Sequence, residues 1–366
     1  MMPDNLTLEL PFAIGAVLLI GVVIYAVTGG ADFGGGIWDL LASGKRAREQ
    51  RLEIARAIGP IWEANHVWLI FVIVLTFSCF PPVFAALSTA LYIPLILILF
   101  GITLRGGAFI FRAYAHDVVI AQRNWGVVFA VTSALTPMLF GMCAGAVAAG
   151  NIRIDDGRVT SGYWTTWIGP FPVVIGLLAF TSCAYLAAVY LCVETEGDLR
   201  EDFRQRALGS GIAFAVLGTL ALPIAWRDAP QIWAGMWNRE TWILIPAAIV
   251  FGLITLAAVW FRQFRLARTT AVIEVAILLG GWALAQHPYL VVPDLTYENA
   301  AASDAMLKVN LIIYGFGAVI LIPSLALLFA LFKGKNPAMT GEYGASTSEL
   351  DPNEGGRGRP HSVGET

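Results

Sequence analysis

The chain has 366 residues and a formal net charge of −3; 57% of its residues are hydrophobic and only 13% are charged. A soluble domain carries about a quarter charged residues, so this composition excludes an ordinary soluble protein. No nucleic-acid partner is expected for such a chain.

Apolar runs of about 20 residues, the length that spans a bilayer, occur nine times. They predict an all-α polytopic membrane protein with about nine transmembrane helices, at 8–28, 57–80, 83–105, 123–149, 168–193, 207–226, 242–261, 269–287 and 309–333. The first helix is expected to continue to about residue 41. Residues 1–333 therefore predict a transmembrane helical domain. Residues 334–366 are rich in Gly, Pro, Ser, Thr and charge, and predict a disordered tail.

Basic residues are shared unevenly between the two sides of this predicted topology. Of 23 Lys and Arg residues, 18 fall on one side. The positive-inside rule makes that side cytoplasmic, so the amino terminus is predicted outside and the carboxyl terminus inside. The first ten residues hold no basic residue and no small-residue cleavage site, so the first helix is expected to stay in the mature protein.

Two polar motifs lie in the first two predicted helices. GGADFGGG, at 29–36, holds Asp32 among glycines. Because no strand precedes it, glycines such as Gly30 and Gly34 are typical of close helix packing, not of a nucleotide-binding loop. GPIWEANHVWLI, at 59–70, sets Glu63 and His66 in an apolar run. An ionisable group at the centre of a membrane helix costs roughly 2.5–3.5 kcal/mol on insertion scales, which makes these residues functional candidates.

The depth of these residues follows from the helical rise of about 1.5 Å per residue. Asp32 is expected roughly 15 Å inside the cytoplasmic end of its helix, and Glu63 roughly 10–12 Å inside the next helix. The two helices form an antiparallel hairpin, so the carboxyl groups are predicted at comparable heights. Glu63 and His66 are three residues apart and share a helix face. Glu63, His66 and Asp32 are therefore predicted to form a polar column that opens toward the cytoplasm.

Two interpretations of this column stay open from the residues alone. Glu63 either takes up protons from the cytoplasm or is a protonated, hydrogen-bonded group that locks the two helices together. For His66, a neutral histidine that bonds across helices is favoured. Trp62, Asn65 and Trp68 are assigned to packing and interhelical hydrogen bonding.

Other polar residues in the apolar runs have simpler expectations. Arg105 is expected to extend from the cytoplasmic end of its helix to the interface, and Asp39 and Glu274 are expected to be interfacial. The four cysteines, which show no ligand spacing, are expected to be buried apolar residues without a metal: Cys79, Cys143, Cys183 and Cys192. No two of the four histidines are expected to face each other at matched depth, so His66 could ligate one haem at most. The expectation is that this chain binds no cofactor and is a poor redox enzyme by itself.

The motifs VTGGADFGGG (27–36) and IGPIWEANHVWLI (58–70) resemble subunit II of cytochrome bd-type quinol oxidases. The resemblance is specific over about residues 10–110, and the rest of the chain matches in its pattern of spans. It implies a protein of the bacterial cell membrane that pairs with a haem-bearing subunit I. In that family, subunit I carries haem b and haem d. The complex oxidises quinol and reduces oxygen to water, and it takes the protons for this reaction from the cytoplasm.

For this chain, the resemblance implies a haem-free subunit that supports haem assembly and lines a proton route. Glu63 occupies the position of the family's acid in helix 2, and Asp32 matches the second acid of its helix 1 motif. Some members carry a further acid where this sequence has Gly29, so any proton step assigned to that acid does not carry over. The sequence leaves open a structural quinone in this chain and a small single-helix subunit in the complex.

Two other functions compete with that of an oxidase subunit. One is a proton-coupled secondary transporter that uses Glu63 and Asp32 as its coupling pair. Transporters often interrupt helices at matching positions in two halves, but GPFPVVIG, at 169–176, opens its predicted helix and does not break it, which counts against a transporter. The other is a membrane scaffold without a proton role, which would tolerate Glu63→Gln.

Overall fold

The computed structural model describes the backbone of residues 10–58, 62–114 and 119–333. The predicted tail at 334–366 and the first nine residues lie outside the described residues. The chain divides into two compact units, residues 1–316 and 317–366. The helices are α1 (Leu10–Leu40), α2 (Ala47–Ile58), α3 (Trp62–Cys79), α4 (Pro81–Ala90), α5 (Tyr92–Tyr114), α6 (Val119–Ala148), α7 (Pro170–Glu194), α8 (Gly197–Asp228), α9 (Pro230–Met236), α10 (Leu244–Trp260), α11 (Phe264–Gln286) and α12 (Asp304–Lys333).

Most of these helices are long and apolar enough to cross a membrane. Seven meet that description on their own: α1, α5, α6, α7, α8, α11 and α12. The described part of α3 and the shorter α4 form a pair bent by 117°, and α10 is a shorter apolar helix. Every predicted span coincides with at least one helix, so the all-α polytopic fold is confirmed. The count of nine and the orientation stay predictions.

The third predicted span differs from the structure. It was placed at 83–105, whereas α4 ends at Ala90 and α5 runs from Tyr92 to Tyr114. The chain bends because Pro81 and Pro82, which lack a backbone N–H, fit the first turn of α4 but cannot continue α3. Beyond residue 105, an apolar stretch extends α5 by more than two turns.

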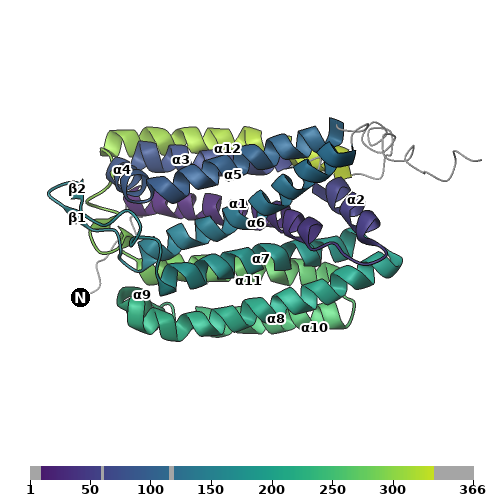
Figure 1. Cartoon of the computed structure of the whole chain (residues 1–366). Coiled ribbons are helices and arrows are strands. Elements are labelled where there is room, and N and C mark those ends of the chain that lie inside the picture. Colours follow the sequence, from purple (N-terminus) through teal and green to yellow (C-terminus); the bar gives the residue numbers. More distant parts are fainter. Residues whose placement is uncertain (1–9, 59–61, 115–118, 334–366) are drawn as a thin grey trace, which may run out of the picture. The chain divides into compact units, whose positions relative to one another are not determined.

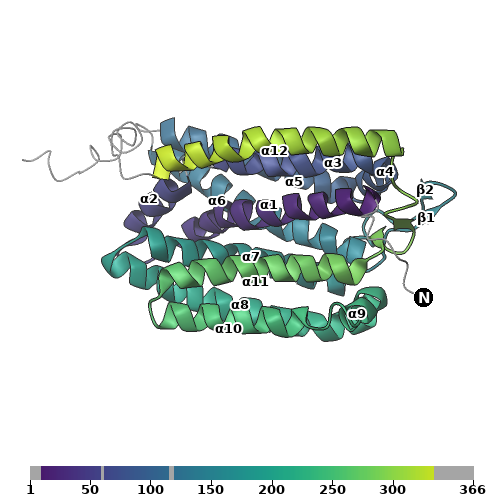
Figure 2. The same ribbon diagram turned by 180° about the vertical axis from the view of Figure 1, so that it is seen from behind.

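Helix α1 packs against α3, α6, α7 and α11, and Figures 1 and 2 show it between these helices. Its glycines allow backbones to approach closely. A Cβ at Gly34 would overlap the backbone carbonyl of Cys183 in α7, and one at Gly36 would overlap the side chain of Ser133 in α6. The glycine-rich half of α1 is thus a contact zone between membrane helices.

Two short antiparallel hairpins lie at the end of the first unit where α1 begins (Figures 1 and 2). Strands β1 (Ile154–Asp155) and β2 (Arg158–Val159) form one, and β3 (Tyr289–Val291) and β4 (Leu295–Thr296) form the other. In the first, Asp156 and Gly157 have φ of 45° and 70°, as a tight two-residue hairpin turn requires. A hydrogen bond connects the two hairpins: the backbone N–H of Ile154 donates to Asp294 Oδ2 at 2.8 Å.

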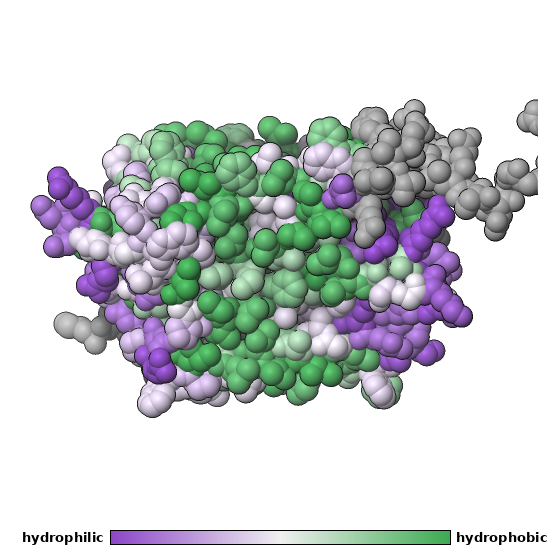
Figure 3. Space-filling model, viewed as in Figure 1, coloured by the Kyte–Doolittle hydropathy of each residue, from purple (hydrophilic) through white to green (hydrophobic). Residues whose placement is uncertain are grey.

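The surface has the polarity of a membrane protein. Apolar side chains cover the middle of the helices in Figure 3, and hydrophilic ones gather at the two ends. Large apolar residues are well exposed in the apolar band, including Phe77 (61%), Leu99 (64%) and Leu253 (61%). Such exposure fits a lipid environment, because water would penalise it.

Candidate functional site

Asp32 of α1 and Asn65 of α3 meet in the interior of the first unit. Each is only 3% exposed, and Asn65 Nδ2 donates a hydrogen bond of 2.5 Å to Asp32 Oδ2. A buried carboxyl group needs such a partner, because burial without hydrogen bonds costs several kcal/mol. The bond joins α1 to α3.

Arg105 of α5 is part of the same cluster. It is 2% exposed; its Nε donates to Ser133 Oγ of α6 at 3.0 Å, and its Nη2 donates to the backbone carbonyl of Asp32 at 3.0 Å. The guanidinium carbon also lies 5.0 Å from the ring centroid of Phe33 and 5.2 Å from that of Phe129, within the range of cation–π attraction. Arg105 therefore connects α5, α6 and α1 at the level of Asp32.

A second acid–base contact lies seven residues further along both helices. Asp39 of α1 is 4% exposed and accepts hydrogen bonds from Arg112 Nη1 of α5 at 3.0 and 3.1 Å. Arg51 of α2 donates to the backbone carbonyl of Asp39 at 3.3 Å. Seven residues are about two helical turns, or roughly 10 Å. The polar contacts between α1 and α5 thus continue from Asp32 to the carboxyl end of α1.

His66 of α3 lies beside this cluster, half-buried among aromatic rings. Its ring centroid is 6.2 Å from that of Tyr25 in an edge-on arrangement and 6.3 Å from that of Phe33. Trp68 packs edge-on against Phe71, at 6.1 Å between ring centroids. The structure therefore brings His66, Asp32 and Asn65 to the same α1–α3 contact.

Glu63 lies in the first turn of α3, and its side chain is outside the described residues, as is that of Trp62. The role of Glu63 therefore stays a prediction.

Gly30 and Gly34 differ in their surroundings. A Cβ at Gly30 would sit at ordinary contact distance, 3.5 Å from Cys183 Sγ and from Leu186. At Gly34 it would overlap the backbone of α7. Gly34 is therefore required where the helices cross, whereas Gly30 has room for a methyl group.

Two expectations about single residues, Arg105 and Glu274, were wrong. Arg105 does not extend to the interface, because α5 continues past it and surrounds it with α1 and α6. Asp39 does lie at the end of α1, but Glu274 lies in the middle of α11 and not near a helix end. Asp39 pairs with Arg112, and Glu274, which is 8% exposed, accepts a hydrogen bond of 3.0 Å from Tyr185 Oη. The four cysteines are free and buried, as expected.

Sequence reasoning missed Arg105 and its partner Ser133. A signal for Arg105 existed: the residues after it, GGAFIF at 106–111, are apolar and would continue a membrane helix, which places Arg105 inside the span. Nothing comparable points to Ser133, because a single hydroxyl in an apolar helix commonly bonds only its own backbone.

The described part of the chain holds no cluster of metal-ligating side chains. No three His, Cys, Asp or Glu side chains there could hold a metal ion. Both ring nitrogens of His66 are buried in protein, and the ring of His287 packs against Phe12 and Tyr297, with centroids 5.8 and 5.7 Å apart. His66 is thus enclosed by protein, whereas His287 is exposed at the end of α11. His116 and His361 lie outside the described residues.

The fold and this site define a polytopic α-helical membrane protein with a buried polar cluster among α1, α3, α5 and α6. Residues 10–332 match the family model described as cytochrome bd terminal oxidase subunit II. The chain belongs to that family. It is one subunit of a terminal oxidase and a multi-pass protein of a bacterial membrane.

Relatives and a solved structure agree with this family. The chain is 29% identical over 313 residues to cytochrome bd ubiquinol oxidase subunit 2 of Bacillus subtilis, covering 82% of this chain and 88% of that protein. It is 25% identical over 356 residues to cytochrome bd-I ubiquinol oxidase subunit 2 of Escherichia coli K12, covering 86% and 91%. The bd oxidase structure from Geobacillus thermodenitrificans has a similar fold, with a TM-score of 0.75 at 21% identity, covering 89% of this chain and 99% of that one.

Proposed function

We propose that this chain is the haem-free subunit of a quinol oxidase complex and lines a route by which cytoplasmic protons reach the partner subunit. The observation that carries the proposal is the buried hydrogen bond from Asn65 to Asp32. Ionisable groups inside a membrane are costly and commonly mark ion or proton pathways. A scaffold could be held together by apolar packing and would not need a buried carboxyl group.

The proposed route begins where α1 ends, at Asp39 and Arg112, and continues along α1 to Asp32. From there it includes Glu63 and His66 of α3, on either side of Asn65 in sequence. In this route Asp32 and Glu63 accept and release protons. Arg105 is a positioning residue, because it holds the α1 backbone at Asp32 through the Asp32 carbonyl.

The substrates and partner follow from the family and from the names of the relatives. The B. subtilis and E. coli relatives are named as ubiquinol oxidase subunits, which supports a quinol as electron donor to the complex of this chain. We assign haem b and haem d, and oxygen reduction to water, to a partner subunit I. We also assign this chain a role in assembling those haems. No observation favours a transporter.

The proton route is tested with Glu63→Gln and Asp32→Asn in the whole complex. Each variant removes a titratable group at nearly constant shape. We expect normal haem content with oxygen reduction slowed by about tenfold or more, and with slower proton uptake, because a lost proton-transfer group costs a large rate factor. The matched control is Glu298→Gln, at an exposed position in the segment after β4. Full turnover and proton uptake in a haem-loaded Glu63→Gln complex would contradict the route.

The assembly role is tested separately. Membranes that contain subunit I without this chain should show weak haem b and haem d bands in a reduced-minus-oxidised spectrum. Full haem bands in those membranes would remove the assembly role and leave the proton route untouched.

A further inference from the structure

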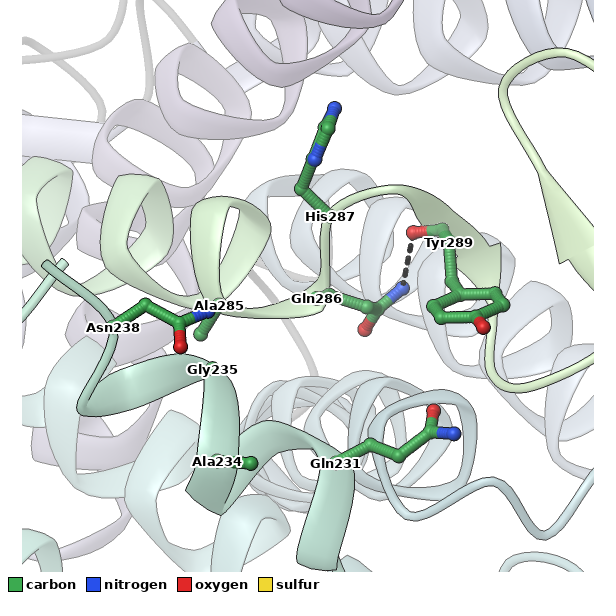
Figure 4. A pocket seen from close by; sticks show the side chains of 8 residues that line it. All are labelled: Gln231, Ala234, Gly235, Asn238, Ala285, Gln286, His287 and Tyr289. Atoms are coloured by element: carbon green, nitrogen blue, oxygen red, sulfur yellow. Dashed lines mark hydrogen bonds between the residues drawn. The ribbon is translucent and has the colours of Figure 1, made fainter. Parts of the chain in front are cut away.

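A polar pocket lies away from the α1–α3 cluster, between α9 and the carboxyl end of α11 (Figure 4). It has a volume of about 240 Å³ and is lined by the amide side chains of Gln231, Asn238 and Gln286, together with His287 and Tyr289. The two helices pack closely beside the pocket: a Cβ at Gly235 of α9 would overlap the Ala285 carbonyl of α11. The pocket is therefore built into the packing of two helices.

Gln286 presents an unused hydrogen-bond acceptor to this pocket. The residue is 6% exposed, and its Nε2 donates to the backbone carbonyls of Tyr289 at 3.2 Å and Leu290 at 3.0 Å. These two bonds fix the orientation of the amide, because the flipped form would place its oxygen against two carbonyl oxygens. Its Oε1 is buried without a hydrogen-bond partner. In Figure 4, Oε1 points toward α9 and away from the Tyr289 carbonyl.

A buried acceptor of this kind calls for a hydrogen-bond donor, and none of the described residues supplies one to Gln286 Oε1. Among the described residues that line the pocket, none is Asp, Glu, Lys or Arg. An ammonium group would therefore enter without a counter-charge, at a high desolvation cost. A neutral hydroxyl group can donate to Gln286 and also bond to the amides of Gln231 and Asn238.

The surroundings of the pocket indicate where such a hydroxyl comes from. Three exposed tryptophans flank it in sequence, Trp226 (66%), Trp237 (54%) and Trp242 (53%). Exposed tryptophans at the ends of membrane helices lie at the level of the lipid head groups. Arg239 follows Asn238 directly and is exposed, so it can meet a phosphate outside the neutral pocket.

We propose that the pocket between α9 and α11 binds the head group of a phospholipid that ends in hydroxyl groups, such as phosphatidylglycerol. The terminal glycerol hydroxyl donates to Gln286 Oε1, and the phosphate stays at the rim near Arg239. The site is independent of the proposed proton route.

The test measures lipid retention by the whole purified complex. The complex is incubated with equal amounts of phosphatidylglycerol, phosphatidylethanolamine and phosphatidylcholine, and bound lipids are counted by native mass spectrometry. We expect phosphatidylglycerol to be retained preferentially. Ala234→Phe, which fills the pocket without touching the bonds of Gln286, should weaken that retention about tenfold, as loss of about one good hydrogen bond implies. Ala305→Phe, at an exposed alanine of α12, is the matched control and should change nothing.

Gln286→Met removes the acceptor and should have the same effect as Ala234→Phe; if it fails to fold, Ala234→Phe decides. Equal retention of the three lipids, or retention unchanged by Ala234→Phe, would overturn the proposal. Displacement of the lipid by free glycerol at low concentration would assign the pocket to a water-soluble polyol instead. A density map with only water, or with a quinone, in the pocket would also overturn it. No turnover is measured, so the outcome does not depend on the proton route.

Discussion

Asn65 of α3 donates its side-chain N–H to Asp32 of α1, and both side chains are 97% buried. Thirty-three residues separate them in sequence. The turn after α1, the helix α2 and the start of α3 lie between them in the chain. This hydrogen bond therefore depends directly on the relative position of α1 and α3.

We expect a double-mutant cycle on Asp32 and Asn65 to show coupling. Asn65→Ala, Asp32→Ala and the double variant should give an interaction free energy of about 0.5–2 kcal/mol, the range for hydrogen bonds between membrane helices. The free energy of unfolding is measured on the purified complex. Asn310→Ala is the control, since Asn310 Nδ2 bonds only to the Met306 carbonyl of its own helix. Strict additivity of the two single variants would show that the bond contributes nothing.

The two glycines of the first motif should respond differently to alanine. Gly34→Ala forces α1 away from the Cys183 carbonyl of α7, so we expect a loss of about 1–3 kcal/mol of stability, as in an overpacked core. Gly30→Ala has room for its methyl group and should change stability by less than about 0.5 kcal/mol. Thermal unfolding of the two complexes measures this difference. Equal losses of stability in the two variants would mean that helix propensity, and not the α1–α7 contact, determines the effect of alanine.

Arg105→Lys should destabilise the protein, although both side chains carry a positive charge. The guanidinium of Arg105 reaches Ser133 and the Asp32 carbonyl with separate nitrogens and stacks on two rings. One ammonium group cannot reproduce this arrangement. We expect a loss of about 1–3 kcal/mol in the free energy of unfolding, because a buried polar contact is left unmade. Arg56→Lys, on an exposed Arg56–Glu53 pair, should change little. A wild-type melting temperature for Arg105→Lys would refute the bridging role.

The sequence predicted the helices well because apolar length is the main physical requirement for crossing a bilayer. It also predicted that Asp32 lies beside α3, because an antiparallel hairpin sets the depth of both helices. The sequence analysis did not predict the bend between α3 and α4, although Pro81 and Pro82 indicate a helix break at that point. The partners of Arg105 could not be predicted, because Ser133 and Phe129 come from α6, and a single sequence does not say which helices become neighbours.

Helix α2 is held to α8 by a cluster of polar contacts that should respond to salt and pH. Arg46 Nη2 donates to Asp202 Oδ1 at 2.6 Å, and Gln50 Nε2 donates to Asp202 Oδ2 at 2.9 Å. The hydrogen bond to Asp202 holds the pKa of Arg46 above its ordinary value, so Arg46 keeps its charge throughout. Acidification therefore weakens the contact between Arg46 and Asp202 by protonating Asp202, and this contact is lost as the pH falls.

We expect Asp202→Asn to speed hydrogen exchange of the α2 amides, Ala47–Ile58, relative to the wild type. The same amides in the wild type should exchange faster at 1 M salt, where the Debye length is about 3 Å, than at 0.1 M, where it is about 10 Å. Asp198→Asn is the matched control, because the Asp198 side chain is 84% exposed and lies farther from Arg46, at 3.3 Å; it should leave exchange almost unchanged. If Asp202→Asn leaves α2 as protected as in the wild type, apolar packing of α2 is sufficient to hold it, and the charged contacts with α8 are dispensable.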